Sequence, residues 1–267
     1  MGRELQHYRL ASKAAGDDTT LTRYVRNDGG HTRQKQRQPR LPGLDNDFIR
    51  EGRTRFGVRV LRVDDMPHLL VSGHSNVKVG RDVRKGRLKG YWIYTLSLEE
   101  RKTCPSSCQH WQSCYGNNMP YAKRVDHTDP AFLPTLEAEI ARLLEQHKGR
   151  VLIRLHALGD FYSIEYVRFW RLMLMRHHTL AVFGYTAREP DSEIGWAVRG
   201  LCADFGDRCM LRFSNADWPI MATVSIGTPE SKPENAFICP EQIRKTQCCA
   251  TCGLCWSTRK NVAFLEH

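Results

Sequence analysis

The sequence predicts an α/β protein with a parallel sheet and alternating helices, in the form of a partial or full (β/α) barrel, followed by a cysteine-rich metal-binding segment. The first observation is that β-rich apolar runs alternate with amphipathic helical stretches between residues 91 and 213. This alternation is typical of right-handed crossovers between parallel strands, in either an open doubly wound sheet or a complete or partial barrel. The second is that 267 residues with 41% hydrophobic content can bury a sizeable core. The third is the clustering of most of the ten cysteines.

The first element of the alternation is a strand expected over residues 91–98, which are rich in β-forming side chains and stop before a group of cysteines. A helix is expected over 134–149, where apolar residues recur at helical spacing. Thr135 is its expected N-cap and Gly149 its stop. The cysteines between these two elements are therefore expected in a loop that follows a strand.

The remaining elements continue the same order. They are a strand at 151–160, a helix at 163–178 capped by Ser163, a strand at 180–187, a helix at 191–206 and a strand at 209–213.

Charge divides the chain unevenly. Residues 1–102 hold 22 Lys and Arg against 12 Asp and Glu, out of a net charge of +11 for the whole chain. Residues 1–45 are expected to form a flexible basic arm, 46–235 the α/β core and 236–267 the cysteine-rich segment. The arm, with the basic stretch 78–90, suits contact with the phosphates of nucleic acid, although a merely solubilising tail is the alternative.

Neither a membrane span nor a secretory signal is readable in the sequence, so a cytoplasmic protein with no membrane partner is expected. The sequence does not indicate an oligomeric state. In a reducing compartment clustered cysteines more often bind metal or carry redox chemistry than form disulfides.

Polar residues gather where the expected strands end. Because ligands bind at the carboxyl ends of parallel strands, the candidate contacts for a cofactor or substrate are Gly159, Asp160, Thr186 and Ser214. Asp160 is also the candidate catalytic residue, as it follows Gly159 at a strand-to-helix turn. The alternative is that these side chains only cap helices or satisfy loops.

Two groups of cysteines are candidate metal ligands. In the C-terminal group, Cys249, Cys252 and Cys255 are spaced C-x2-C-x2-C, and a fourth thiol ten residues upstream completes the C-terminal set: Cys239, Cys249, Cys252 and Cys255. Four thiolates make a closed site for zinc or an iron–sulfur cluster. Cys248 is interpreted as a bystander, with a pairing of Cys239 and Cys248 with two of the later three as the alternative.

The other group lies in TCPSSCQHWQSCYGNNM (103–119), the three-cysteine loop, with Cys104, Cys108 and Cys114. Three ligands leave a coordination position open for water, substrate or cofactor. His110 could instead fill that position and make a structural Cys3His zinc site. Spacing alone leaves zinc and iron–sulfur open at both groups.

The motifs NVKVG (76–80), RLHALGDFYSIEYVRFW (154–170), VFGYTARE (182–189) and CATCGLCW (249–256), with the three-cysteine loop, resemble the gene product 88 family of phage and prophage proteins. The order of strand, three-cysteine loop and Gly-Asp turn is also similar, more distantly, to radical S-adenosylmethionine enzymes. Those enzymes use a C-x3-C-x2-C loop, whereas the spacing here is C-x3-C-x5-C.

The resemblance to radical S-adenosylmethionine enzymes implies an iron–sulfur cluster on the three-cysteine loop, S-adenosylmethionine as cofactor beside Gly159 and Asp160, and a reaction on nucleic acid or a nucleotide-derived substrate. The rival hypothesis is a non-enzymatic, zinc-stabilised nucleic-acid-binding protein, in which both cysteine groups are structural.

Overall fold

The computed structural model describes residues 25–26, 32–33 and 46–265. The basic arm expected over 1–45 lies outside the described residues, apart from the backbone of an antiparallel pair of short strands, β1 (Val25–Arg26) and β2 (Thr32–Arg33). The short elements that follow are α2 (Asp47–Arg50), β3 (Val60–Leu61) and β6 (Arg124–Val125), of which β3 and β6 form a small parallel pair.

The main sheet has eight strands in the order β11-β12-β10-β9-β8-β7-β5-β4. All neighbouring pairs are parallel except β4 with β5, at one edge. The strands are β4 (Leu70–Ser72), β5 (Trp92–Ser97), β7 (Val151–Leu158), β8 (Ala181–Thr186), β9 (Cys209–Ser214), β10 (Ala222–Ile226), β11 (Ala236–Ile238) and β12 (Asn261–Leu265). The four strands expected from the sequence are β5, β7, β8 and β9.

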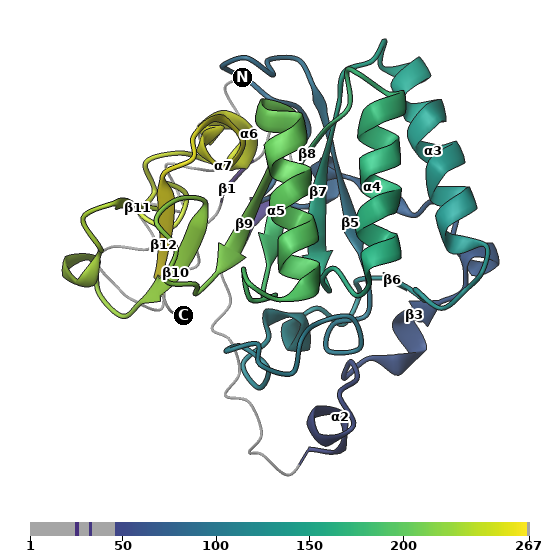
Figure 1. Ribbon diagram of the computed structural model, residues 1–267, viewed down its shortest axis with the longest axis horizontal. Helices are drawn as coiled ribbons and strands as arrows, with labels where there is room; N and C mark the ends of the chain where they lie inside the picture. Colours follow the sequence, from purple (N-terminus) through teal and green to yellow (C-terminus); the bar gives the residue numbers. More distant parts are fainter. Residues whose placement is uncertain (1–24, 27–31, 34–45, 266–267) are drawn as a thin grey trace.

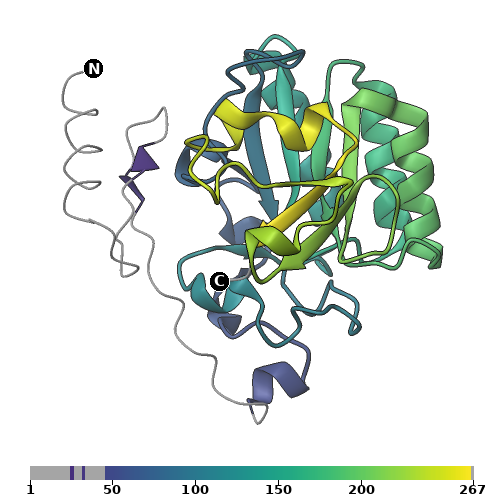
Figure 2. The ribbon, with the colours of Figure 1, turned by 90° about the vertical axis from the view of Figure 1, so that its left-hand side faces the viewer.

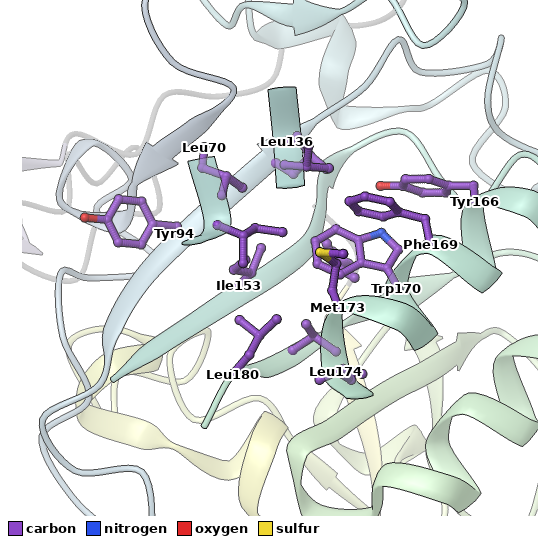
Figure 3. Close-up of a cluster of buried hydrophobic side chains, with 14 of the residues drawn as sticks. Leu70, Tyr94, Leu136, Ile153, Tyr166, Phe169, Trp170, Met173, Leu174 and Leu180 are labelled. Atoms are coloured by element: carbon purple, nitrogen blue, oxygen red, sulfur yellow. The ribbon is translucent and has the colours of Figure 1, made fainter. Parts of the chain in front are cut away.

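Three crossover helices pack side by side on one face of this sheet (Figure 1). They are α3 (Phe132–Gln146), α4 (Ile164–Arg176) and α5 (Glu193–Phe205), which fall on the three expected helices. The core between helices and sheet is built from apolar side chains such as Leu136, Ile153 and Trp170, each fully buried (Figure 3). Burial of this apolar surface is the main stabilisation of the fold.

The opposite face of the sheet is covered by the C-terminal segment, which crosses it in Figure 2. Two short helices, α6 (Cys249–Cys252) and α7 (Leu254–Ser257), belong to it. Trp256 of α7 packs edge-on against Phe183 of β8, with ring centroids 4.9 Å apart, and joins a second core with Leu152 and Met210. The sheet is therefore buried on both faces, as parallel sheets usually are.

Of the two helix N-caps expected from the sequence, one is found in the structure and one is not. Ser163 caps α4, since its Oγ accepts a hydrogen bond from the Tyr166 N–H at 3.1 Å. The expected cap at Thr135 is wrong, because α3 begins at Phe132 and Thr135 lies in its first turn. Instead the Asp129 carboxylate accepts from the Ala131 N–H at 3.0 Å, and Pro134 is tolerated in a first turn, where its missing N–H costs little.

Within the described residues the sheet is open, with β4 and β11 as edges, so the expectation of a full barrel is not met. Three crossover helices are too few to supply the eight βα units of a closed barrel. Beyond β9 the sheet is extended by short strands, two of which, β11 and β12, come from residues 236–267. None of the helices in the described ranges combines the length and apolar character needed to cross a bilayer.

Candidate metal centres

The three-cysteine loop follows the carboxyl end of β5 and lies beyond the arrowheads of the parallel strands in Figure 1. Its three thiols are neighbours. Burial raises the pKa of Cys104 well above the ordinary value, and the charges of Asp160, Cys114 and Cys108 raise it further. Burial likewise raises the pKa of Cys114 to about 11. The loop thus lies at the strand ends, while convergence of its three thiols on one centre stays a prediction.

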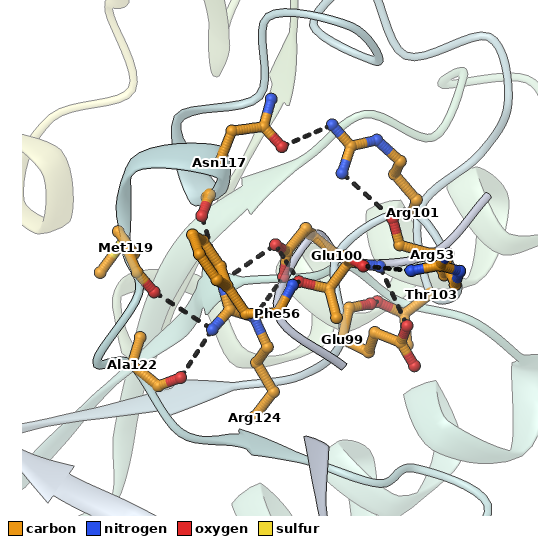
Figure 4. A network of polar contacts seen from close by, with 12 residues as sticks. Arg53, Phe56, Glu99, Glu100, Arg101, Thr103, Asn117, Met119, Ala122 and Arg124 are labelled. Atoms are coloured by element: carbon orange, nitrogen blue, oxygen red, sulfur yellow. Dashed lines mark hydrogen bonds and ion pairs between the residues drawn. The ribbon is translucent and has the colours of Figure 1, made fainter. Parts of the chain in front are cut away.

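A buried ion pair clamps this loop (Figure 4). The Arg124 guanidinium donates from Nε to Glu100 Oε2 at 2.7 Å and from Nη2 to Glu100 Oε1 at 3.0 Å, and both side chains are inaccessible to solvent. Arg124 also donates to the carbonyls of Gly116, Met119 and Ala122. Because these carbonyls follow Cys114, one arginine fixes the path of the loop after its last cysteine.

A second arginine holds the middle of the loop. Arg101 donates from Nη2 to Asn117 Oδ1 at 2.8 Å and from Nε to the Trp111 carbonyl at 2.9 Å. Its Nη1 donates to the Arg53 carbonyl at 3.2 Å, which ties the loop to the segment after α2. Neither Arg101 nor the Glu100–Arg124 pair was identified by sequence reasoning, because their partners are distant along the chain or are backbone carbonyls.

The Gly159–Asp160 turn packs directly against the loop. The Asp160 N–H donates to Thr103 Oγ1 at 3.1 Å. Gly159 has a positive φ of 83°, and a Cβ there would lie 2.6 Å from Thr103 Oγ1. Only glycine therefore allows this approach of the β7 end to the loop.

The Asp160 carboxylate joins the ends of two strands. Its Oδ1 accepts from the Phe161 N–H and its Oδ2 from the Ala187 N–H, each at 2.7 Å, and its side chain also bonds Thr186. Burial, to 2% exposure, raises its pKa to about 6 despite these hydrogen bonds. In this arrangement both oxygens are occupied by the chain itself, which is the geometry of a structural link between β7 and β8.

The other two candidate contacts occupy different positions. Thr186 is buried, at 1% exposure, and its Oγ1 accepts a hydrogen bond from the Arg188 N–H at 3.0 Å. It lies beside the Asp160 turn, where its side chain is hydrogen-bonded to Asp160. Ser214 ends β9 and is separated from that turn by β8. Arg188, to which the sequence assigned no role, donates to the carbonyls of Phe161 at 2.7 Å and Thr103 at 2.8 Å, and so joins the turn to the loop.

Both ring nitrogens of His110 contact serine hydroxyls in this structure. Nδ1 lies 3.2 Å from Ser113 Oγ, and Nε2 lies 3.2 Å from Ser225 Oγ on β10. The histidine thus connects the three-cysteine loop to strand β10.

The C-terminal set gathers around one small cavity of about 10 Å³, lined by all four of its cysteines together with apolar neighbours. A volume of this size holds about one water-sized sphere. Gly253, with a φ of +77°, separates α6 from α7 and lets the C-x2-C-x2-C run turn back on itself. Cys239 enters from the end of β11, where its N–H donates to the Ala263 carbonyl at 2.9 Å.

Cys248 does not line this cavity. It is fully buried, and its Sγ lies 3.7 Å from Thr251 Oγ1 at the start of α6. The geometry therefore favours the interpretation of Cys248 as a bystander. Tyr185 of β8, in contrast, donates its hydroxyl to Cys255 Sγ at 3.0 Å and connects the set to the sheet.

As the side chains stand, no group of three or more His, Cys, Asp or Glu residues within the described ranges is arranged to hold a metal ion. None of the ten cysteines, all of which lie within the described residues, forms a disulfide. Zinc and iron–sulfur assignments at either group therefore stay predictions, and closing either site requires rotation of thiol side chains toward a common centre.

Comparison with known proteins supports the resemblance to the gene product 88 family. The sequence model described as Gene product 88 matches residues 69–194, which include the three-cysteine loop and the Asp160 turn but not the C-terminal set. The chain is 27% identical over 164 residues to the Gene 88 protein of Mycobacterium phage L5, covering 55% of this chain and 69% of that protein. No solved structure matches. Neither sequence match shows a similarity to radical S-adenosylmethionine enzymes.

Proposed function

We propose that the chain is a phage-type metalloprotein with two cysteine-ligated centres of different character. The C-terminal set would hold a closed structural centre, and the three-cysteine loop would hold an iron–sulfur cluster with one open position. The observation that carries the proposal is the contrast in donors: four thiols line one cavity in the first region, whereas the second has three half-buried thiols in a loop at the strand ends.

The closed centre is supported by the room and the donors. Four thiols saturate a tetrahedral site, and the cavity of about 10 Å³ that they line is of the right order for one ion. The polypeptide around it, with β11 entering from one side and α6 and α7 from the other, would be held together by the metal. Zinc suits this role because it binds four thiolates without redox chemistry.

The open centre is supported by the clamp around three thiols and by the position of the loop. Both nitrogens of His110 face serine hydroxyls, so no fourth ligand from within the loop is in place. When bound there, an iron–sulfur cluster would supply an electron to a ligand at its open position. The Glu100–Arg124 pair would hold the loop rigid. The Gly159–Asp160 turn, which packs against Thr103, would shield that side of the loop from water.

The Asp160 carboxyl raises the pKa of Cys104, whereas Glu100, near Cys114, is paired with Arg124, so Asp160 gives this side of the loop its acidic character. A cationic ligand suits such surroundings. S-adenosylmethionine, a sulfonium cation, is therefore the first small molecule to try as cofactor, with Asp160, Gly159 and Thr186 forming the nearby strand ends and Ser214 a more distant one.

The experiment is anaerobic purification of the wild type and two variants, Cys108→Ser and Cys252→Ser, with measurement of iron, sulfide and zinc. We expect iron and sulfide to be lost in Cys108→Ser while zinc remains, and zinc to be lost in Cys252→Ser. Addition of S-adenosylmethionine should change the electron paramagnetic resonance spectrum of the reduced wild type. A protein that carries only zinc, at both groups, contradicts the open iron–sulfur centre.

The second candidate function is a zinc-stabilised nucleic-acid-binding protein. It is favoured by an exposed basic turn, with Arg84, Lys85, Arg87 and Lys89, whose Arg84 N–H donates to the Ala250 carbonyl beside the C-terminal set at 2.9 Å. Binding through such a turn would follow phosphates and weaken steeply with salt. A titration with DNA and RNA at two salt concentrations tests it, and affinity unchanged by salt or by Lys85→Glu would exclude this surface.

A further inference from the structure

Strand β7 is mostly apolar and contains one arginine, Arg154, to which the proposed functions assign no role. Arg154 pairs in register with Thr95 on β5 and Phe183 on β8. Its neighbour Ile153 faces the helices, and Leu152 faces the C-terminal segment. Because side chains alternate along a strand, Arg154 also points to the side of the C-terminal segment. Its guanidinium lies over the Tyr185 ring, 5.6 Å from the centroid.

Arg154 lacks the acceptors that such a group normally has. Its Nε is buried without a hydrogen-bond partner, and the guanidinium makes no hydrogen bond or ion pair with any residue that the structure describes. By comparison, Arg124 is bound by a carboxylate and three carbonyls, and Arg212 donates to the carbonyls of Thr258 and Lys260. Arg154 as a whole is half-buried, but its Nε is shielded from water without an acceptor, so an anion from outside the described chain would stabilise the guanidinium.

The surroundings of Arg154 place it between the two cysteine groups. The groups whose charges act most on it are Tyr115, Tyr185, Cys249 and Cys255, and none of these is a carboxylate. Tyr115 directly follows Cys114 in the three-cysteine loop, while Tyr185 bonds Cys255. Tyr115 is 46% exposed, so this side of the site is open to solvent.

We propose that Arg154 binds the oxyanion of a small ligand, a carboxylate or a phosphate, between the three-cysteine loop and the C-terminal segment. A guanidinium presents two parallel N–H donors to either group, and the phenol of Tyr115 offers a further donor at the open side. The site deepens the proposed function, on which it rests only for placing the ligand's other end beside the open position of the loop. Anion binding itself requires Arg154 and not a metal.

The test is calorimetric titration of inorganic phosphate and of succinate into the full-length protein, in chloride buffer, with metal content measured on the same samples. Three variants are compared with the wild type. Arg154→Met removes the charge, Arg154→Lys keeps the charge but not the paired donors, and Arg168→Met removes an exposed charge on α4 as a matched control.

We expect one site per chain for at least one of the two anions, with affinity reduced at least tenfold in Arg154→Met, reduced several-fold in Arg154→Lys and unchanged in Arg168→Met. The preferred anion identifies the ligand as a phosphate or a carboxylate compound. If Arg154→Met fails to fold, Arg154→Lys decides the question. Failure of the wild type to bind either anion, or equal binding by the Arg154 variants, overturns the proposal.

The metal measurement separates the two proposals. Anion binding that depends on Arg154 in a protein without iron leaves the anion site standing and contradicts the open iron–sulfur centre. Iron in a protein that binds neither anion supports the iron–sulfur centre and contradicts the anion site.

Discussion

The two cysteine groups differ less in their spacing than in the charges that surround them. Burial raises the pKa values of the three loop thiols and those of Cys239, Cys249 and Cys252 in the C-terminal set. In the loop, Asp160 and Glu100 raise them further, while Arg101 lowers those of Cys108 and Cys114. Around the C-terminal set, Lys78 lowers the pKa values of Cys239 and Cys249, and Lys85 lowers that of Cys252. Lysines therefore act on the C-terminal set, whereas carboxyl groups and Arg101 act against each other at the three-cysteine loop.

In each region the number of thiols is consistent with the charges of the neighbouring side chains. Four thiolates around a divalent ion leave a net negative charge, which nearby cations stabilise. Three thiolates next to carboxylates leave the better position for a neutral or cationic ligand. Four substitutions test the difference between the two regions.

The largest effect is expected from Cys252→Ser. Loss of one of four ligands would remove the metal from the C-terminal set, and structural zinc contributes on the order of 10 kcal/mol to folding in small sites. Because β12 follows α7 and lies inside the sheet, we expect the whole chain to lose several kcal/mol of stability. Thermal unfolding with zinc analysis measures this.

Two variants serve as controls for that experiment. Cys108→Ser should lose the metal of the loop while leaving the unfolding of the C-terminal region nearly unchanged. Cys202→Ser, outside both groups, should keep all metal. Equal destabilisation by Cys108→Ser and Cys252→Ser would remove the distinction between the two regions.

The next largest loss of stability is expected from Glu100→Gln. It leaves the Arg124 cation buried without its anion, which costs about 3–5 kcal/mol of unfolding free energy. Urea denaturation measures the loss, and Glu137→Gln, in an exposed pair with Arg176, is the control, expected to cost less than about 1 kcal/mol. Zinc at the C-terminal set should be retained, and its loss in Glu100→Gln would contradict the independence of the two regions.

The pH dependence of stability reports Asp160. Its pKa of about 6 in the folded chain lies above its ordinary value of 3.8, so the folded state binds the proton more tightly than the unfolded state. This contribution to stability is present below about pH 4 and is lost as the pH rises to about 6, a change of about 3 kcal/mol at 1.36 kcal/mol per pH unit.

Asp160→Asn removes this titration and is the comparison to make. Unfolding free energies at pH 4 and pH 7, wild type minus variant, should show the difference. An equal pH dependence in both proteins would mean that Asp160 titrates normally. If Asp160→Asn also abolishes an activity while metal is retained, the catalytic role expected from the sequence would gain its first support.

The smallest effect is expected from Tyr185→Phe. It removes the hydrogen bond to Cys255 Sγ, worth on the order of 1 kcal/mol, and should speed the loss of zinc to a chelator. Tyr115→Phe, beside the three-cysteine loop, is the matched control and should leave zinc release unchanged. The same rate in Tyr185→Phe and the wild type would show that this bond does not support the C-terminal centre.

The sequence predicted those parts of the fold that local patterns determine. Helices α4 and α5 and strands β7 to β9 are long enough for periodicity to show, and the Ser163 hydroxyl marked a helix start. Strands β11 and β12 escaped prediction because they are short and are defined by pairing with each other and with β10.

The candidate sites were predictable to a similar degree. Spacing identified the cysteines, but neither the Glu100–Arg124 pair nor the bonds of Arg188 could be found without the fold, since their partners are remote in sequence or are backbone atoms. Arg154 did carry a signal, because a charged residue within the apolar run VLIRLHAL is rare unless it is paired.

The position of β12 has a consequence for synthesis of the chain. It is made after β10 and β11 yet lies between them, paired in parallel with both. Until residues 261–265 leave the ribosome, β10 is an uncovered edge strand and β11 has no partner in the sheet. A nascent chain is therefore exposed to wrong strand pairing at this edge until β12 has emerged and paired with β10 and β11.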